Sequence, residues 1–555
     1  MRKTPVVPFV LVGVALSLTL AWFTFRRVEP DVESVPIPAS PVVVLTDQHD
    51  SLQPFMEGIF AADRDVDPPD GYRIRGVIVP HHLTASATIA SGIRMLEHQG
   101  FKRIILLSPD HFNRCPTMLC TADAVFQTQF GDIRPATETL EILRASSLVT
   151  EEPNLFAREH GISAVAPFIA HYQPGIFVTP LVLSRRLPWR AEKDALLDLF
   201  AQATDEDTML IVSSDFSHYL PLAAADEMDE LTAEALFAKD LDGIASLQTP
   251  AQSDCPGCLW IMAALADEGG FYNPSVVMHT NSARILGDEK IAETTSHFSM
   301  VWYENAHLDG ADLALAGDVT LTRGTPPALP DAVAAWWSGS GPRVVNLEGP
   351  IFETCAPRAN PYLFCNEVQA WRQIRDLATH WGVMNNHMLD LGAGSPVETA
   401  GHLRAEGEAV ITANPAEVGG WRIVALTTSM NPVPDAASAR LTKTEEETLA
   451  ALREGDTDVP TVVFVHGGEE YGALSADVDD ARWERFIDAG ADAVVVSHSH
   501  VPSDVRIYDG RPIFRGLGNF LFDQLDRAAT FTAKLVRLRY DDGRVLFETL
   551  VAPIQ

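Results

Sequence analysis

The chain has 555 residues, 46% of them hydrophobic and 21% charged, so it is long enough for two or three domains with large buried cores. With 41 Lys and Arg against 75 Asp and Glu, its formal net charge is −34. This excess of negative charge excludes a protein that holds nucleic acid through a basic patch, and we expect no nucleic-acid partner. Metal cations, in contrast, suit an acidic chain.

The chain begins with an apolar segment at residues 4–25, which contains 22 residues without a charge between two pairs of basic residues. A helix of that length spans about 33 Å, enough for a bilayer core of about 30 Å. We therefore expect a transmembrane signal anchor over residues 1–27 and a single-pass protein of the inner (cytoplasmic) membrane, with the bulk of the chain extracytoplasmic or periplasmic. A cleaved signal peptide is the alternative, although residues 21–25 make a poor cleavage site. A Pro-rich spacer follows at residues 28–41.

Two series of β-rich apolar runs alternating with helical stretches fill the rest of the chain, which is typical of α/β domains. The first series covers residues 42–306 and the second residues 311–555, so the predicted boundary lies at residues 307–310. In the first series the strands are expected near residues 76–79, 103–107, 176–183 and 209–212, and helices at 85–99 and 191–202.

The six cysteines fall into three close pairs, Cys115/Cys120, Cys255/Cys258 and Cys355/Cys365. An even number in local pairs suits an oxidising compartment and disulfide bonds. Six cysteines in a chain of this length are also an ordinary number of buried thiols, and the spacing leaves both readings open.

Polar residues follow three of the strands expected in the first domain. Because ligands of open α/β sheets sit beyond the carboxyl ends of the strands, these residues are candidates for one shared site. The runs end in His81 and His82, in Asp110 and His111, and in Asp215 and His218. Together they predict a metal site or an acid/base site at this rim.

These segments resemble the Memo family, including its bacterial members called AmmeMemoRadiSam system protein B. The matching pieces, between about Arg75 and Tyr303, are Val79-Pro80-His81, Ser108-Pro109-Asp110-His111, Glu159-His160, Ser213-Ser214-Asp215-Phe216-Ser217-His218-Tyr219 and Cys255. The resemblance implies a fold like that of extradiol dioxygenases and one Fe, Cu or Zn ion bound by His81, His111 and Cys255. It also implies that Asp215 and His218 line the same pocket as candidate catalytic residues.

The sequence departs from this family at its cysteine. The family has a Cys-Gly pair where this chain reads Cys255-Pro256-Gly257-Cys258. Cys258 is therefore an alternative ligand, and a disulfide between Cys255 and Cys258 would remove the thiolate altogether.

The second domain repeats the pattern of polar residues after apolar runs. The runs end in Gly317-Asp318, Asn346-Leu347-Glu348, Asn385-Asn386-His387, His466 and Ser497-His498-Ser499-His500. Carboxylates, an amide and imidazoles are the ligand types of a two-metal phosphoesterase, and a histidine that binds no metal can protonate the leaving group. This pattern predicts such a centre.

From Asp312 to about Gln524 the chain resembles the CapA family, the poly-γ-glutamate capsule biosynthesis proteins of the calcineurin-like metallophosphoesterase superfamily. Besides the strand ends above, the resemblance is carried by Gly349-Pro350, Met388-Leu389-Asp390-Leu391-Gly392, Gly467-Gly468-Glu469-Glu470-Tyr471 and Gly516-Leu517-Gly518-Asn519-Phe520-Leu521-Phe522-Asp523. It implies an α/β sandwich with two divalent metals (Mn, Fe or Zn) held by Asp318, Glu348, Asn386, His466, His498 and His500. His387 would be the catalytic histidine, with Glu470 and Asn519 in support. Thr320 stands where the superfamily has a histidine of its first motif.

The two resemblances imply a metalloprotein of capsule or cell-envelope polymer synthesis, with a hydrolase or transferase centre in its C-terminal domain. An envelope polymer or a small phosphoester or γ-glutamyl compound is the expected substrate, and capsule synthase subunits are candidate partners. Two alternatives stay open: a metal-binding interaction or export module that catalyses nothing, and oxygen or redox chemistry at the Memo-like site.

Overall fold

The computed structural model describes residues 43–46, 51–322, 328–355, 360, 362–429, 445–455, 458–522, 524 and 527–554. Of the described helices, none is at once long and apolar enough to cross a bilayer. The predicted anchor at residues 4–25 and the spacer at 28–41 lie outside the described residues. The finding corrects our expectation: an N-terminal transmembrane helix and a single-pass inner-membrane location are not supported.

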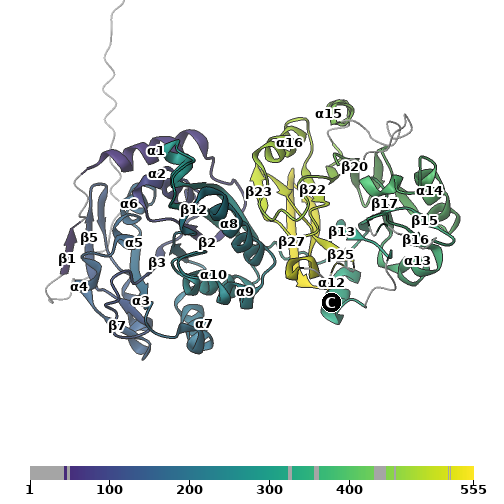
Figure 1. Ribbon diagram of the computed structural model, residues 1–555. Coiled ribbons are helices and arrows are strands. Elements are labelled where there is room, and N and C mark those ends of the chain that lie inside the picture. The colour runs from purple at the N-terminus through teal and green to yellow at the C-terminus, as the bar shows by residue number, and fades with distance from the viewer. Residues whose placement is uncertain are drawn as a thin grey trace, which may run out of the picture. The chain divides into compact units, whose positions relative to one another are not determined.

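The N-terminal domain is built on a nine-stranded sheet with a mostly parallel centre (Figure 1). In spatial order its strands are β10 (His218–Leu220), β12 (Thr294–Tyr303), β2 (Ile74–Val79), β9 (Thr208–Ser213), β3 (Arg103–Pro109), β8 (Phe177–Leu183), β4 (Leu119–Thr121) and β7 (Val149–Glu151), with β11 (Pro274–Asn281) paired to β12. β2, β9, β3 and β8 run parallel, whereas β12 runs antiparallel to β2. A small separate sheet contains β1 (Val43–Thr46), β5 (Ala124–Thr128) and β6 (Gly131–Ile133), and Arg134, directly after β6, forms a bridge to Phe177 of β8.

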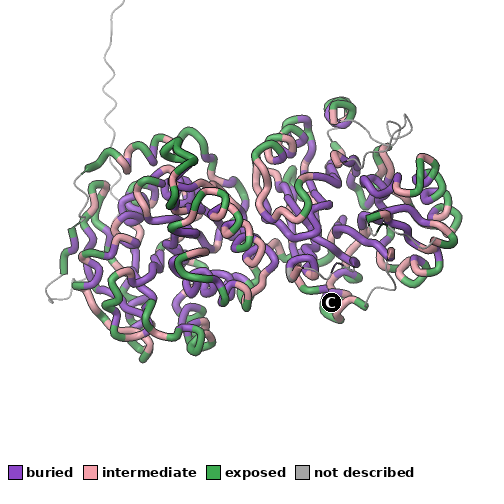
Figure 2. The backbone as a smooth tube through the Cα atoms, in the orientation of Figure 1, coloured by how far each residue is buried: buried purple, intermediate pink, exposed green. Residues whose placement is uncertain are grey.

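Both faces of this sheet are covered by helices, because its central strands are apolar on both sides. In β3, Ile104 and Leu106 pack in one core cluster, and Ile105 and Leu107 in another. The first cluster includes residues of α1 (Gln53–Asp65), α2 (Ser86–Arg94) and α6 (Ala166–Tyr172), and the second those of α7 (Lys193–Ala203), α8 (Leu222–Phe237), α9 (Leu241–Ser246) and α10 (Pro256–Glu268). Figure 2 shows the central strands buried and the loops exposed. The α/β character predicted from the alternating runs is confirmed.

The C-terminal domain contains two larger sheets. One orders β18 (Ala409–Ile411), β17 (His380–Gly382), β14 (Arg343–Leu347), β13 (Leu313–Val319), β26 (Thr532–Asp541) and β27 (Arg544–Pro553), with β25 (Asn519–Leu521) paired to β13. The other orders β19 (Ala416–Val418), β20 (Trp421–Thr427), β21 (Thr461–His466), β22 (Ala493–Ser497), β24 (Arg511–Phe514) and β23 (Val505–Tyr508). The short strands β15 (Ile351–Phe352) and β16 (Asn366–Glu367) pair separately.

Alternating side chains explain how these two sheets pack. Leu315 of β13 and Phe464 of β21 belong to one shared cluster, so the inner faces of the sheets meet. The outer faces pack on helices: α12 (Asp331–Ser338), α13 (Val368–Ile374) and α14 (Ser395–Ala405) on one side, and α15 (Glu445–Arg453) and α16 (Asp477–Asp488) on the other. The result is a helix–sheet–sheet–helix sandwich (Figure 1). The carboxyl ends of β13, β14, β21 and β22 carry the predicted site residues. The predicted boundary at residues 307–310 falls between the end of β12 and the start of β13.

Candidate metal centres

The C-terminal domain gathers all seven predicted residues in one buried cluster. His466 Nε2 lies 2.9 Å from Asn386 Oδ1, 3.1 Å from His498 Nδ1 and 3.7 Å from Glu348 Oε1. Asp318 Oδ2 accepts a hydrogen bond from the His498 backbone amide at 3.0 Å and lies 3.6 Å from His500 Nδ1. Loops that follow parallel strands bring these residues together, as the strand-end pattern predicts.

Glu348 is the feature that most clearly points to a cation. Its side chain is fully buried, and neither carboxylate oxygen has a hydrogen-bond partner among the described residues. Burial, with the nearby charge of Asp318, raises its pKa well above the usual value. An unpaired buried carboxylate is costly, and a bound cation is one way to remove that cost. The donor set around Glu348 fits a divalent metal.

His500 is oriented toward Glu348 by a chain of amide hydrogen bonds. Asn519 donates through Nδ2 to Gln524 Oε1 and to the Thr530 carbonyl, so its Oδ1 is the acceptor for His500 Nδ1 at 2.9 Å. The lone pair of His500 Nε2 is then free, 4.0 Å from Glu348 Oε1. Such second partners are typical of metal-binding histidines.

Two groups of ligand atoms in this cluster share His498. Glu348, His466 and His498 form one group, and Glu470, His498 and His500 form the other, with the ligand atoms of each group within 4.8 Å of one another. Burial and the adjacent imidazoles lower the pKa of His498 to about 2, so its ring is neutral, as a metal ligand must be. His498 and His500 also adopt positive φ angles of 98° and 58°, which are costly for residues other than glycine.

His387 is held in place from two sides. Its Nδ1 lies 2.8 Å from Asp390 Oδ2, and the ring of Phe364 stacks on it with centroids 3.9 Å apart. Its Nε2 faces Glu348 Oε1 at 3.7 Å. Asp390, Asn346 and Asn385 complete the surroundings: Asn346 donates to Asp318 Oδ1 at 2.7 Å, and Asn385 donates to Asn346 Oδ1 at 3.1 Å.

In the N-terminal domain, two predicted histidines meet around a carboxylate that was not predicted. Asp254 Oδ2 lies 3.2 Å from His81 Nε2 and 3.3 Å from His111 Nε2. Asp254 is buried and immediately precedes Cys255, where Pro256 opens α10. Although burial opposes the charged ring, Asp254 and Glu159 raise the pKa of His111 to about 9.

Asp215 occupies the centre of the same rim. Its Oδ1 lies 2.7 Å from His297 Nδ1, and its Oδ2 lies 2.5 Å from His82 Nδ1 and 3.1 Å from His81 Nε2. His218 is the second predicted catalytic residue, and its Nδ1 donates a hydrogen bond to the Phe216 carbonyl at 2.7 Å. His218 also forms a candidate metal-ligand group with His82 and Asp215. Burial lowers the pKa of His218.

The structure pairs all six cysteines as the sequence spacing suggests, in Cys115–Cys120, Cys255–Cys258 and Cys355–Cys365. In this disulfide form Cys255 has no thiolate to offer. The ligand set that the Memo resemblance implies, His81, His111 and Cys255, therefore lacks its sulfur, and the departure at Cys258 accounts for the loss.

Several residues of the N-terminal rim were missing from the predicted site. Glu159 and His160 were noted only as part of a motif, and burial together with the neighbouring imidazoles lowers the pKa of His160 to about 4. His297 follows no strand; it lies inside β12, which runs antiparallel to β2, so the early part of that strand meets the rim. Because the first residues of β12 read Thr294-Thr295-Ser296-His297, this histidine does not follow or interrupt an apolar run, and the strand-end pattern could not identify it.

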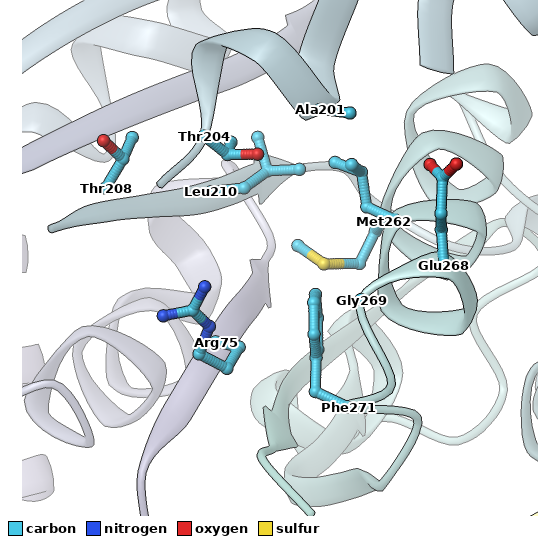
Figure 3. Close-up of a pocket in the computed structure, with 10 residues that line it drawn as sticks. Arg75, Ala201, Thr204, Thr208, Leu210, Met262, Glu268, Gly269 and Phe271 are labelled. Carbon is cyan, nitrogen blue, oxygen red and sulfur yellow. The ribbon is translucent and has the colours of Figure 1, made fainter. Parts of the chain in front are cut away.

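A separate cavity of about 200 Å³ lies in the N-terminal domain, away from these histidines (Figure 3). Its lining includes Arg75 of β2, Thr208 and Leu210 of β9, and Met262 of α10. Arg75 and Thr208 stand at the beginnings of their strands, whereas His81 and Asp215 follow the strand ends. The cavity is therefore at the opposite edge of the sheet from the candidate centre.

Comparisons with known proteins agree with the two domains. Residues 44–292 match the family model "Memo-like protein", and residues 312–524 match "Bacterial capsule synthesis protein PGA_cap". A MEMO1 family protein of Ignicoccus hospitalis is 24% identical over 224 residues, which cover 39% of this chain and 78% of the relative. One of Pyrobaculum aerophilum is 24% identical over 208 residues, 36% of this chain and 72% of the relative.

Among solved structures, an uncharacterized protein of Escherichia coli K12 is similar to this chain with 14% identity and a TM-score of 0.29, over 41% of this chain and all of that protein. A TM-score this low indicates nothing about function. The two family matches, in contrast, coincide with the two clusters of ligand-type residues, and metal use is suggested for both domains. The chain is a fusion of a Memo-like domain with a bacterial capsule synthesis domain of the PGA_cap family.

Proposed function

We propose that this protein is a metal-dependent hydrolase or transferase of capsule or envelope-polymer synthesis, whose chemistry takes place at the C-terminal centre. The observation that supports this most is Glu348, a buried carboxylate without a hydrogen-bond partner among the described residues, facing His387, His466 and His500. Two divalent cations there would polarise a substrate oxygen and neutralise charge that develops during the reaction.

The residues around this centre have two roles in the proposal, binding of the metal ions and proton transfer. Asp318, Glu348, Asn386, His466, His498 and His500 would hold the cations, with Glu470 at the more exposed side. His387 is the proton donor in this proposal, because Asp390 fixes its Nδ1 and stabilises the imidazolium, while Nε2 points into the centre. A proton on Nε2 can then pass to the leaving-group oxygen or nitrogen.

The expected substrate is a phosphoester or a γ-glutamyl polymer. The geometry of a two-metal centre suits the first, and the capsule synthesis family suits the second. The acidic chain would repel a polyanion, so the cations would also serve to attract the substrate.

The test uses the purified full chain, reconstituted with Mn²⁺, Fe²⁺ or Zn²⁺ and supplied with aryl phosphomonoesters and phosphodiesters or with γ-glutamyl polymer. In the form that turns over substrate, His387→Ala should lower kcat by about 10²- to 10⁴-fold, the usual contribution of a general acid, with unchanged metal content. His402→Ala on α14, outside the cluster, is the matched control and should leave kcat unchanged.

Two results would overturn the proposal. Loss of metal from His387→Ala would show that His387 is a ligand. Full metal occupancy without turnover of any of these substrates would favour a metal-binding interaction module.

A further inference from the structure

The N-terminal centre has a carboxylate at the place where a thiolate was expected. With both Cys255 and Cys258 in a disulfide, the sulfur is unavailable, and Asp254 is the residue whose oxygen lies between His81 Nε2 and His111 Nε2. The side chain of Asp254 is 6% exposed, and that of His81 is 1% exposed. This exchange alters the donor set from sulfur and nitrogen to oxygen and nitrogen.

Hydrogen bonds determine which nitrogen of His81 carries the proton. Ser213 donates its single hydroxyl proton to the Gly161 carbonyl at 2.6 Å, so its Oγ can only accept from His81 Nδ1, 3.1 Å away. A neutral His81 then presents the lone pair of Nε2 to two carboxylate oxygens, from Asp215 at 3.1 Å and Asp254 at 3.2 Å. Among the described residues, neither His81 Nε2 nor Asp215 Oδ2 has a hydrogen-bond partner at a suitable angle, although both atoms are buried and Asp215 Oδ2 lies 2.5 Å from His82 Nδ1.

The same reasoning applies to His111. Glu159 is fully buried and accepts at Oε1 from the Gly161 amide and at Oε2 from the His111 amide, which suits an ionised carboxylate. It therefore accepts from His111 Nδ1 as well, at 2.5 Å, and His111 Nε2 faces Asp254 Oδ2 at 3.3 Å. Two ring nitrogens and a carboxylate oxygen converge, and positive charge between them, from a proton or from a bound cation that replaces it, stabilises the arrangement.

Asp254 itself is held so that one oxygen stays available. Ser214 donates to Asp254 Oδ1 at 2.7 Å, which leaves Oδ2 directed at the two histidines. An outer partner on each of the three side chains (Ser213, Glu159 and Ser214) is the arrangement that orients metal ligands.

We propose that His81, His111 and Asp254 form a two-histidine, one-carboxylate site for a divalent first-row cation, with Asp215 as a further oxygen beside it. This donor set is typical of non-haem Fe(II), and it disfavours the Cu(I) that a thiolate would select. The proposal is independent of the C-terminal chemistry.

Co²⁺ is the probe, because cobalt bound to a thiolate absorbs in the near ultraviolet through charge transfer from sulfur. The experiment uses the full chain with its disulfides intact and no reductant present. The substitution Asp318→Ala weakens cobalt binding at the C-terminal centre, and the amount of bound cobalt and its near-ultraviolet absorption are then measured. We expect about one equivalent at the N-terminal centre and no thiolate charge-transfer band. Appearance of that band would show a sulfur ligand and would overturn the proposal. This first measurement needs no substitution at His81, His111 or Asp254.

Variants then identify the ligand. Asp254→Asn should weaken cobalt binding by about 100-fold or more, since loss of an outer partner alone costs about 10- to 100-fold. The double variant Cys255→Ser/Cys258→Ser should retain the equivalent, as should Asp267→Asn, an exposed control on α10. Three outcomes would each overturn the assignment. Asp254→Asn could bind cobalt as well as the unsubstituted protein does, the double serine variant could be the one that loses cobalt, or the unsubstituted N-terminal centre could bind none. The last outcome would mean that protonated histidines balance the carboxylates.

Discussion

His387 Nδ1 lies 2.8 Å from Oδ2 of Asp390, and that same carboxylate oxygen accepts a hydrogen bond from the Phe364 amide at 2.7 Å. Asp390 therefore both orients the imidazole and stabilises its charged form. The pair resembles other acid–histidine pairs in which the acid fixes the tautomer and the second nitrogen does the chemistry.

Replacing Asp390 tests this relationship. Asp390→Asn keeps the size of the side chain but removes its charge, so we expect kcat to fall by about 10- to 100-fold with no loss of bound metal. Steady-state kinetics and elemental analysis of the same preparations measure kcat and bound metal together. A kcat equal to that of the unsubstituted protein would show that His387 acts without Asp390.

His498 belongs to both candidate ligand groups of the C-terminal centre, whereas Glu470 belongs to one of them. His498→Ala should therefore reduce the metal content of this centre by more than one equivalent, and Glu470→Ala by about one. Elemental analysis of the two variants, beside Glu469→Ala as a neighbouring control, measures the difference. Equal losses from both variants would contradict a shared ligand.

Glu348 has opposite effects on stability with and without a cation. In chelator, Glu348→Gln should raise the free energy of unfolding by about 1–3 kcal/mol, because an unpaired buried carboxylate is replaced by a neutral amide. With saturating Mn²⁺ the unsubstituted protein should be the more stable one, since binding to the native state adds stability. Thermal unfolding in both conditions checks the reversal, and a destabilised Glu348→Gln protein in chelator would contradict it.

Lys534 predicts a dependence of stability on alkaline pH. It is fully buried and donates to the Ser503 carbonyl, and burial lowers its pKa to about 8 from the ordinary 10.5. Between these values the unfolded chain binds more protons than the folded one, so this lysine makes stability rise with pH. Relative to Lys534→Met, the unsubstituted protein should gain about 3 kcal/mol of unfolding free energy from pH 8 to 10.5. Lys102→Met, at an exposed position, should show no such trend.

The strand-end rule located most of the C-terminal centre, because its ligands follow parallel strands whose carboxyl ends share one edge. Glu348 and His466, 118 positions apart in sequence, meet for this reason. The rule fails for His297, whose antiparallel strand brings its beginning to the rim. Local spacing also could not choose between a thiolate and a disulfide at Cys255, because that depends on the geometry of the chain around Cys258. Asp254 was overlooked since it precedes the cysteine that the family resemblance emphasises.

The Cys255–Cys258 disulfide has a consequence for the durability of the N-terminal centre. Peroxide and alkylating agents attack exposed thiolates first, so a centre built on a cysteine ligand would be inactivated at its own metal-binding atom. Here the sulfur atoms are already joined to each other, and a carboxylate faces the histidines in their place. A centre of this kind would tolerate surroundings rich in oxidants, and a strong reductant would become the agent able to restore a competing sulfur ligand.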